Sequence, residues 1–379
     1  MKIALVVHDA RPGGGQDRYV LELANGLAAV HDVTLVAISA EGLSEAVHWQ
    51  PVTVPKRPWI LRATRFSSKA RRIVRADRWD IVHTIGGAMP GATVITAQFC
   101  QAAWAAVQRR ARLSLVGPVE RIYRDMNTGI AERSERRAAR DKDLRALIAV
   151  STRTASEWHT WYDLTTTDVT VVPNGVDAAR FTPSAATDRG TIRSELGITD
   201  STKILLTVGA LLRKGIETSL RALKRLPEDV HLMAIGAGPH ERIRSLAHKL
   251  NVSRRFHLMH PVGDIERYYR AADVFLFPTR YEPFGMVIAE AWASRVPVVV
   301  SACSGATEWA THERHAMIVP DALNAEAFAH DVSRVLTDGD LADRLKINGQ
   351  ELASQFTWER VVQDTARVYE RASSDTTKS

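Results

Sequence analysis

Short runs of apolar residues recur along the chain, and polar, Gly-rich or Pro-rich segments separate them. A run of four to eight such residues predicts a buried strand. These runs cover residues 3–7, 31–38, 80–84, 92–96, 145–150 and 169–172, and then 203–208, 231–235, 255–259, 273–277 and 296–300. Amphipathic stretches between them, such as residues 16–29 and 216–225, predict helices. The alternation of strand and helix predicts an α/β fold with parallel sheets.

Several predicted strands end in a turn that leads straight into a helix. Residues 13–15 are three consecutive glycines, and Gly209, Gly236, Gly285 and Gly305 follow other strands. Turns of this kind at the carboxyl edge of a parallel sheet form a crevice that binds nucleotides. The turn at Gly236 resembles a dinucleotide fingerprint, but the third glycine and the following acidic residue are absent.

Length and charge divide the chain into two halves. At 379 residues it is long enough for two domains, each with its own core. Residues 1–180 hold 25 Lys and Arg against 18 Asp and Glu, whereas residues 181–379 hold 25 of each. The most basic segment, residues 56–78, has nine cations against Asp77 alone, with Trp59 and Phe66 among them. Such a segment either is a solvated face or lies on an anionic membrane.

Cysteine use and hydropathy indicate the environment of the protein. Cys100 and Cys303 are far apart and have no metal-ligand spacing, which predicts a reduced, cytoplasmic protein. Residues 2–7 are too short for a signal peptide, and no apolar run approaches the ~20 residues that span a bilayer. Any membrane contact is therefore expected to be peripheral, on the inner face of the cell membrane.

Residues 280–290 carry the most specific chemistry in the sequence. A strand ends at Pro278, a turn with Glu282 follows, and a helix that contains Glu290 begins after Gly285. The free amides of residues 284–287 at this helix terminus suit an anion. Carboxylates beside an anion site suit hydroxyl groups, and phosphate next to hydroxylated rings describes a nucleotide sugar. The alternative is that Glu282 caps the helix and Glu290 faces solvent.

Two adjacent cations, Arg213 and Lys214, follow the strand at residues 203–208. In isolation they would be surface charge, but beside an anion site they suit a diphosphate leaving group. Asp17, in the first turn of the helix after the triple glycine, is either an acceptor-side residue or a partner of the helix dipole.

These motifs together resemble the retaining family-4 glycosyltransferases. Glu282-Pro-Phe-Gly285 and Glu290 match the family's paired-glutamate motif, and Gly14, Gly15, Asp17 and Arg18 match its N-terminal loop. Residues 172–183 match its interdomain segment. A histidine that contacts the donor sugar in many members is absent, and Gln98 stands near its place. Within the family, the second half is most similar to the lipopolysaccharide core glucosyltransferases.

The resemblance implies a GT-B fold, in which two Rossmann-like domains face one another across a cleft. The expected ranges are an acceptor-side domain at residues 1–180, a donor domain at 181–355, a helix crossing back at 356–372 and a disordered tail at 373–379. The implied catalytic residues are Glu282, Arg213, Lys214 and Asp17. The implied donor-binding residues are Gly14, Gly15, Gly209, Gly236, Val262, Phe284, Gly285, Met286, Val287 and Glu290.

The implied reaction transfers a hexose, expected to be glucose, from a UDP-sugar to a membrane-associated glycan such as lipopolysaccharide core. The anomeric configuration is retained, and no cofactor or metal takes part. Three alternatives stay open: a GDP-mannose-dependent mannosyltransferase, a dinucleotide-dependent oxidoreductase, and a nucleic-acid-binding protein suggested by the net charge of +7.

Overall fold

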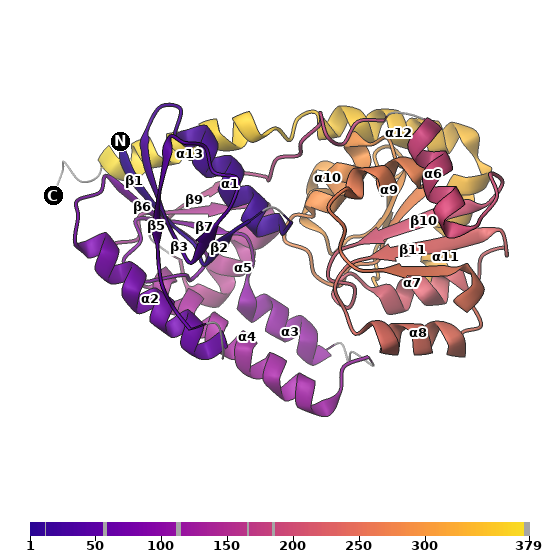
Figure 1. Cartoon of the computed structure of the whole chain (residues 1–379), viewed down its shortest axis with the longest axis horizontal. Helices are drawn as coiled ribbons and strands as arrows, with labels where there is room; N and C mark the ends of the chain where they lie inside the picture. The colour runs from indigo at the N-terminus through magenta and orange to yellow at the C-terminus, as the bar shows by residue number, and fades with distance from the viewer. Residues whose placement is uncertain (12, 56–58, 111–114, 165–166, 184–185, 375–379) are drawn as a thin grey trace. The chain divides into compact units, whose positions relative to one another are not determined.

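The chain folds into two compact units, which are described separately below (Figure 1). The computed structural model describes residues 1–11, 13–55, 59–110, 115–164, 167–183 and 186–374. The first unit comprises Met1–Arg112, Val116–Gly175 and Trp358–Ser379, and the second comprises Leu113–Leu115 and Val176–Thr357. Residues 176–180, which the sequence assigned to the first domain, therefore group with the second unit.

The first unit is built on a seven-stranded parallel sheet in the order β5-β3-β1-β6-β7-β8-β9. Its strands are β1 (Lys2–Val6), β3 (Asp32–Ala37), β5 (Val47–Pro51), β6 (Ile81–Ile85), β7 (Val94–Ala97), β8 (Ala146–Ala149) and β9 (Asp168–Val171). Two short strands, β2 (Asp9–Ala10) and β4 (Ser39–Ala40), pair separately. The central strands β1, β6 and β7 are buried on both faces, as is typical of a parallel sheet.

In the part of the first unit that the structure describes, six helices accompany the sheet. They are α1 (Gly15–Leu27), α2 (Trp59–Arg75), α3 (Gln101–Arg110), α4 (Pro118–Ala139), α5 (Thr152–Tyr162) and α13 (Trp358–Ser374). Ser151 caps α5, because its hydroxyl accepts a hydrogen bond from the Thr154 amide at 3.1 Å. Helix α13 returns to this unit from the end of the chain, and Tyr369 hydrogen-bonds His83 at 2.6 Å.

Three details differ from the expectation. The sequence predicts a long helical region at residues 113–145 with interruptions at Gly117-Pro118 and Gly129, whereas α4 begins at Pro118 and passes through Gly129 without a break. Helix α13 extends to Ser374, two residues into the expected tail, and residues 375–379 lie outside the described part of the chain. In the basic segment, Lys56 and Arg57 also lie outside it, and most of the remainder forms α2.

The second unit is built on a six-stranded parallel sheet in the order β12-β11-β10-β13-β14-β15. Its strands are β10 (Lys203–Val208), β11 (Val230–Ile235), β12 (Phe256–Met259), β13 (Val274–Phe277), β14 (Val298–Ser301) and β15 (Met317–Val319). Its helices are α6 (Ala186–Leu196), α7 (Ile216–Leu223), α8 (His240–Lys249), α9 (Ile265–Ala271), α10 (Met286–Ala293), α11 (Ala325–Thr337) and α12 (Gly339–Ala353).

In each sheet the chain first adds strands on one side of its first strand, β1 or β10, and then adds the remaining strands on the other side. The reversal falls between β1 and β6 in the first sheet and between β10 and β13 in the second. This is the doubly wound order of Rossmann-like domains, whose ligands bind outside the carboxyl ends of the strands at the reversal. The predicted α/β class with two Rossmann-like sheets is confirmed.

Candidate functional site

The loops after β10 and β13 meet at the reversal point of the second sheet. The Arg280 amide donates a hydrogen bond to the Arg213 carbonyl at 3.1 Å, and the Thr279 hydroxyl donates to the same carbonyl at 3.3 Å. Gly215 has φ +80°, and a Cβ there would lie 1.9 Å from the Pro278 carbonyl oxygen. The two loops that the sequence singled out are therefore packed backbone against backbone.

Lys214, Arg213 and Glu282 form a buried ion cluster where these loops meet. Lys214 Nζ donates a short hydrogen bond to Glu282 Oε2, and Arg213 Nη1 lies 3.3 Å from the same oxygen. Burial lowers the pKa of Lys214 well below its usual value, and nearby Arg213 lowers it further, whereas Glu290 raises it. Burial also lowers the pKa of Arg213 to about 10. The sequence predicted that these three residues lie at one site, but it did not show that Glu282 pairs with both cations.

Helix α10 begins beside this cluster. Gly285 caps it with φ +108°, and a Cβ there would lie 2.9 Å from both Ser304 Oγ and Ile288 Cδ1. Within the described chain, the amides of Phe284, Gly285, Met286 and Val287 have no hydrogen-bond acceptor. The positive end of α10 is therefore available to an anion.

The turn before α10 is fixed from behind by the loop after β14. The Glu282 amide donates to the Cys303 carbonyl at 3.1 Å, and the Ala306 amide donates to the Phe284 carbonyl at 2.7 Å. The Phe284 ring is buried against Trp309 and Phe356. Phe284 thus anchors the turn in the core with its side chain and offers only its backbone to a ligand.

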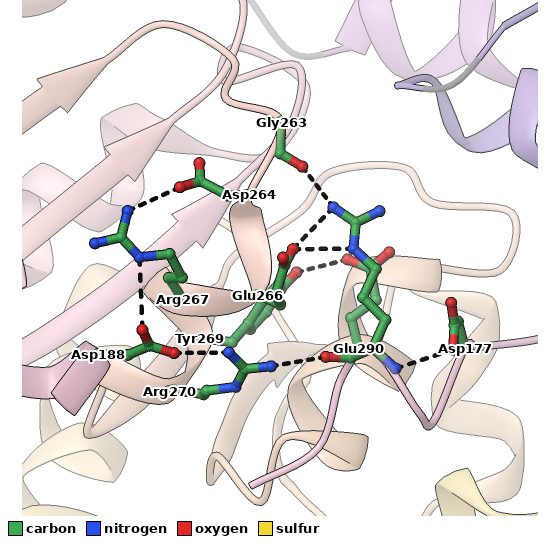
Figure 2. A network of polar contacts seen from close by, with 10 residues as sticks. Asp177, Asp188, Gly263, Asp264, Glu266, Arg267, Tyr269, Arg270 and Glu290 are labelled. Carbon is green, nitrogen blue, oxygen red and sulfur yellow. Dashed lines mark hydrogen bonds and ion pairs between the residues drawn. The ribbon is translucent and has the colours of Figure 1, made fainter. Parts of the chain in front are cut away.

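Glu290 has a buried partner that the sequence did not reveal. The Tyr269 hydroxyl lies 2.9 Å from Glu290 Oε2 (Figure 2). The same hydroxyl lies 3.2 Å from the Val287 carbonyl oxygen. The Tyr269 ring is fully buried and packs edge-on against Phe181 with centroids 5.6 Å apart. Burial raises the pKa of Tyr269 well above its usual value, and the Glu290 carboxylate raises it further, so the phenol stays a donor. Tyr269 therefore holds one oxygen of Glu290 in place.

A polar network surrounds this pair and ties residues 177–182 to α9 (Figure 2). Arg180 donates to Glu266 at 2.9 Å and to the Gly263 carbonyl at 2.5 Å. Arg270 donates to Asp188 at 2.7 Å and to the Arg180 carbonyl at 3.0 Å. The network fixes the loop after β12, which contains the predicted donor residue Val262.

Gly209 and Gly236 lie at the same edge of the second sheet. The Gly209 amide donates to the Ile235 carbonyl at 2.9 Å, and the Gly236 amide donates to the Met259 carbonyl at 3.1 Å. A Cβ on Gly236 would lie 1.8 Å from the Gly209 carbonyl oxygen. These glycines therefore allow the turns after β10 and β11 to approach closely.

The other predicted residues, Gly14, Gly15 and Asp17, belong to the first unit. They form the N-terminus of α1 at the carboxyl edge of the first sheet. Burial raises the pKa of Asp17 to about 6, nearby Asp9 raises it further, and Arg11 opposes the change. A carboxylate that only served the helix dipole would show the opposite shift. Asp17 is therefore in an environment suited to taking up a proton near neutral pH.

Gln98, which stands in place of the family histidine, is engaged in a reciprocal amide pair. Its side chain donates to Asn174 at 2.8 Å and accepts from it at 2.9 Å. Nearby, the buried Glu135 carboxylate accepts from the Tyr162 hydroxyl at 2.6 Å and from the Gln101 amide at 2.8 Å. Burial raises the pKa of Glu135 to about 8. Sequence reasoning missed Glu135, since an acidic residue in a charged helix predicts an exposed side chain.

The described residues contain no group of three or more His, Cys, Asp or Glu that could hold a metal ion. Metal independence remains a prediction. Both cysteines are free thiols. None of the described helices combines the length and hydropathy needed to cross a membrane.

Comparison with known families agrees with the fold and with the motifs at this edge. Residues 13–180 match the model described as "Glycosyltransferase Family 4", and residues 188–352 match "Glycosyl transferases group 1". The two matched ranges together cover most of both units. The chain therefore belongs to the group 1, or family 4, glycosyltransferases.

Individual relatives include a D-inositol 3-phosphate glycosyltransferase of Xylanimonas cellulosilytica, which is 32% identical over 60% of this chain and 57% of its own length. The chain spans little more than half the length of this and similar curated relatives. Among solved structures, WaaG, a glycosyltransferase involved in lipopolysaccharide biosynthesis, has a TM-score of 0.80 at 22% identity, covering 97% of this chain and 99% of WaaG. Anabaena HepE in complex with UDP-glucose has a TM-score of 0.73 at 17% identity, covering 98% and 100%. These structural likenesses establish the GT-B fold.

Proposed function

We propose that this chain is a retaining glycosyltransferase that transfers a hexose from a UDP-sugar to a membrane-associated glycan. The observation that carries the proposal is the convergence of two cations, an open helix terminus and Glu290 at the reversal point of the second sheet. The HepE structures that hold UDP and UDP-glucose lend support to the UDP-sugar. WaaG, which is involved in lipopolysaccharide biosynthesis, lends support to a lipopolysaccharide-type acceptor.

In the proposed mechanism the second unit holds the donor. Glu290, oriented by Tyr269, accepts hydrogen bonds from the ribose hydroxyls. Arg213, Lys214 and the amides at the start of α10 stabilise the diphosphate as its bond to the sugar breaks. Its developing negative charge faces cations that are already fixed in position, so little reorganisation accompanies the step.

Glu282 is better suited to a sugar hydroxyl than to covalent catalysis. One of its oxygens already accepts hydrogen bonds from Lys214 and Arg213, which makes the carboxylate a weak nucleophile. The acceptor's proton would pass to the leaving diphosphate. In the first unit, Asp17 would contact the acceptor hydroxyl.

Phosphorylated polyols are a second class of acceptor. Relatives named D-inositol 3-phosphate glycosyltransferases favour this alternative, as does the net positive charge of residues 1–180. A GDP-mannose donor is the remaining alternative within the family. Both alternatives leave the roles of Glu290 and Lys214 unchanged.

Nucleotide binding tests the proposal most directly. Thermal-shift measurements with UDP, GDP, ADP and NAD should show stabilisation by UDP. Replacing Glu290 by Ala removes a charged acceptor worth about 1.5–3 kcal/mol per hydrogen bond, so UDP affinity measured by calorimetry should fall about 10- to 150-fold. Glu326→Ala, which removes an exposed glutamate from the first turn of α11, is the matched control. Unchanged UDP affinity in folded Glu290→Ala protein would exclude Glu290 from the site.

A further inference from the structure

Helix α4 carries a stripe of exposed apolar side chains in the first unit. Val119, Ile122, Tyr123 and Met126 are 81%, 69%, 47% and 46% exposed. Their spacing of three, four and seven residues places them on one face of the helix. Singly exposed apolar residues are ordinary, but four that share one helical face form a surface that calls for a partner.

The same face becomes cationic toward the end of α4. Arg133 lies seven residues after Met126, and Arg137 and Arg140 follow at spacings of four and three. All three side chains are exposed. The face therefore presents apolar side chains over its first half and guanidinium groups over its second.

The opposite side of α4 is fixed to the unit. Glu135, Ala138 and Ala139 are buried, and Arg136 donates to the Trp161 carbonyl at 3.3 Å. A Cβ on Gly87 would lie 2.5 Å from the Glu135 amide nitrogen, which shows how closely the loop after β6 approaches. Because its rear is held, α4 cannot turn the apolar stripe inward without breaking these contacts.

Helix α2 lies in the basic segment that the sequence singled out for membrane contact, and several of its apolar side chains point into the unit. Its apolar residues Phe66, Ala70 and Val74 are buried in the core of the first unit. Its Arg62 pairs with Asp9 at 2.5 Å, and its Lys69 donates to the Thr53 carbonyl at 2.7 Å. Among the side chains that the structure describes, Leu61, at 43% exposure, is the large apolar one that α2 leaves exposed, so α2 offers a membrane less apolar surface than α4 does.

We propose that α4 docks the first unit on an anionic lipid bilayer. Val119, Ile122, Tyr123 and Met126 enter the boundary between headgroups and acyl chains, and the cations further along the face contact lipid phosphates. Apolar burial combined with attraction to anionic lipid is the physics of helices that lie in the membrane plane. The proposal deepens the proposed function, because it states how the enzyme reaches a membrane-borne acceptor.

A lipid surface fits this face better than a second copy of the chain or another protein. The bilayer presents hydrocarbon and anionic phosphate side by side, which matches the two halves of the face. A second copy would bring the same cationic segment to the interface, where like charges are unfavourable unless acidic groups oppose them. An acidic protein partner is the remaining possibility, and failure of the parent protein to bind anionic vesicles in the experiment below would favour it over a lipid surface.

Co-sedimentation of the full chain with vesicles tests the proposal. The parent protein should bind phosphatidylglycerol vesicles and not phosphatidylcholine vesicles. Ile122→Ser/Met126→Ser should weaken binding to the anionic vesicles at least about tenfold, because each buried CH₂ contributes to the affinity. Val30→Ser/Ile347→Ser, which removes two other exposed apolar side chains at 73% and 54% exposure, should leave binding unchanged. Arg133→Gln/Arg137→Gln should weaken binding at low salt and make the remaining binding less sensitive to salt.

The outcomes separate this proposal from its rivals and from the proposed function. If the α4 apolar variant binds vesicles as the parent does, or if Arg65→Gln/Arg72→Gln in α2 alone abolishes binding, the α4 proposal is wrong. If the parent is a dimer by light scattering and the α4 variant a monomer, the face is a protein interface. UDP affinity should be equal in all variants, so a failure to bind UDP would count against the proposed function alone.

Discussion

Replacing Lys214 by Ala would remove the cation that contacts Glu282 most closely in the second unit. Both side chains are buried, at 7% and 11% exposure, and Arg213 remains 3.3 Å from the carboxylate. Breaking a buried ion pair by removing one partner costs about 3–5 kcal/mol. Since Arg213 stays in place, we expect the free energy of unfolding to fall by about 3 kcal/mol. For a unit of this size that corresponds to a fall in melting temperature of roughly 6–12 °C.

The same variant should also lose turnover. Lys214 is proposed to stabilise charge that develops on the leaving diphosphate, so its removal should lower kcat more than it weakens donor binding. Loss of one preorganised stabiliser predicts a decrease of at least about 100-fold at saturating UDP-sugar. Steady-state kinetics on protein shown to be folded by circular dichroism would measure it. Lys224→Ala, an exposed lysine at the end of α7, controls for loss of a positive charge.

A double variant separates the two effects. Lys214→Met/Glu282→Met replaces the pair by apolar side chains, which in other proteins restores much of the stability of a broken pair. We expect it to be more stable than Lys214→Ala but equally slow in turnover. Near-normal turnover with only a raised KM in Lys214→Ala would refute the catalytic role. A double variant no more stable than the single one would refute the ion-pair argument.

Two further variants test buried groups that the sequence did not reveal. Tyr269→Phe removes the donor to Glu290 and should weaken UDP binding about tenfold, by loss of one hydrogen bond to a charged group. In a Glu290→Ala background, Tyr269→Phe should not weaken UDP binding further, and the control Tyr268→Phe should leave UDP binding unchanged. If Tyr269→Phe weakens UDP binding equally with and without Glu290, Tyr269 does not act by positioning Glu290. Glu135→Gln should change the pH dependence of stability. The native state holds the Glu135 proton up to about pH 8 and the unfolded state releases it near pH 4.5. The free energy of unfolding should therefore fall by about 1.4 kcal/mol per pH unit over this window in the parent. Urea unfolding from pH 5 to 8 should show that the free energy of unfolding falls less steeply with pH in the variant than in the parent. Parallel pH profiles of the two proteins would contradict the raised pKa of Glu135.

The sequence predicted the sheets well because both units bury their central strands on two faces. Runs such as residues 204–206 and 274–277 are apolar throughout, and the turns that follow these strands carry the chemistry. In a parallel sheet these turns necessarily meet at one edge. The proximity of Arg213 and Glu282, 69 residues apart in the chain, could therefore be predicted without knowing their contact.

Other features depend on tertiary packing and could not be predicted in this way. Gly129 suggested an interruption, but a glycine in a helix costs only about 1 kcal/mol, and the 22-residue helix α4 absorbs it. Tyr269 lies in the seven-residue helix α9, too short for its periodicity to show which face is buried. The basic segment at residues 56–78 suggested either a solvated face or membrane contact, and the sequence did not show that Phe66, Ala70 and Val74 of α2 pack in the core of the first unit.

The carboxylates in the second unit have an electrostatic role toward Lys214 besides any contact with substrate. Burial alone lowers the pKa of Lys214, and Arg213 lowers it further, so an isolated lysine here would lose its proton readily. Glu290 opposes that shift through its charge, and Glu282 accepts a hydrogen bond from the ammonium group. A neutral amine could not stabilise a departing diphosphate. Both carboxylates therefore favour the charged form of Lys214, which its proposed role toward the diphosphate requires.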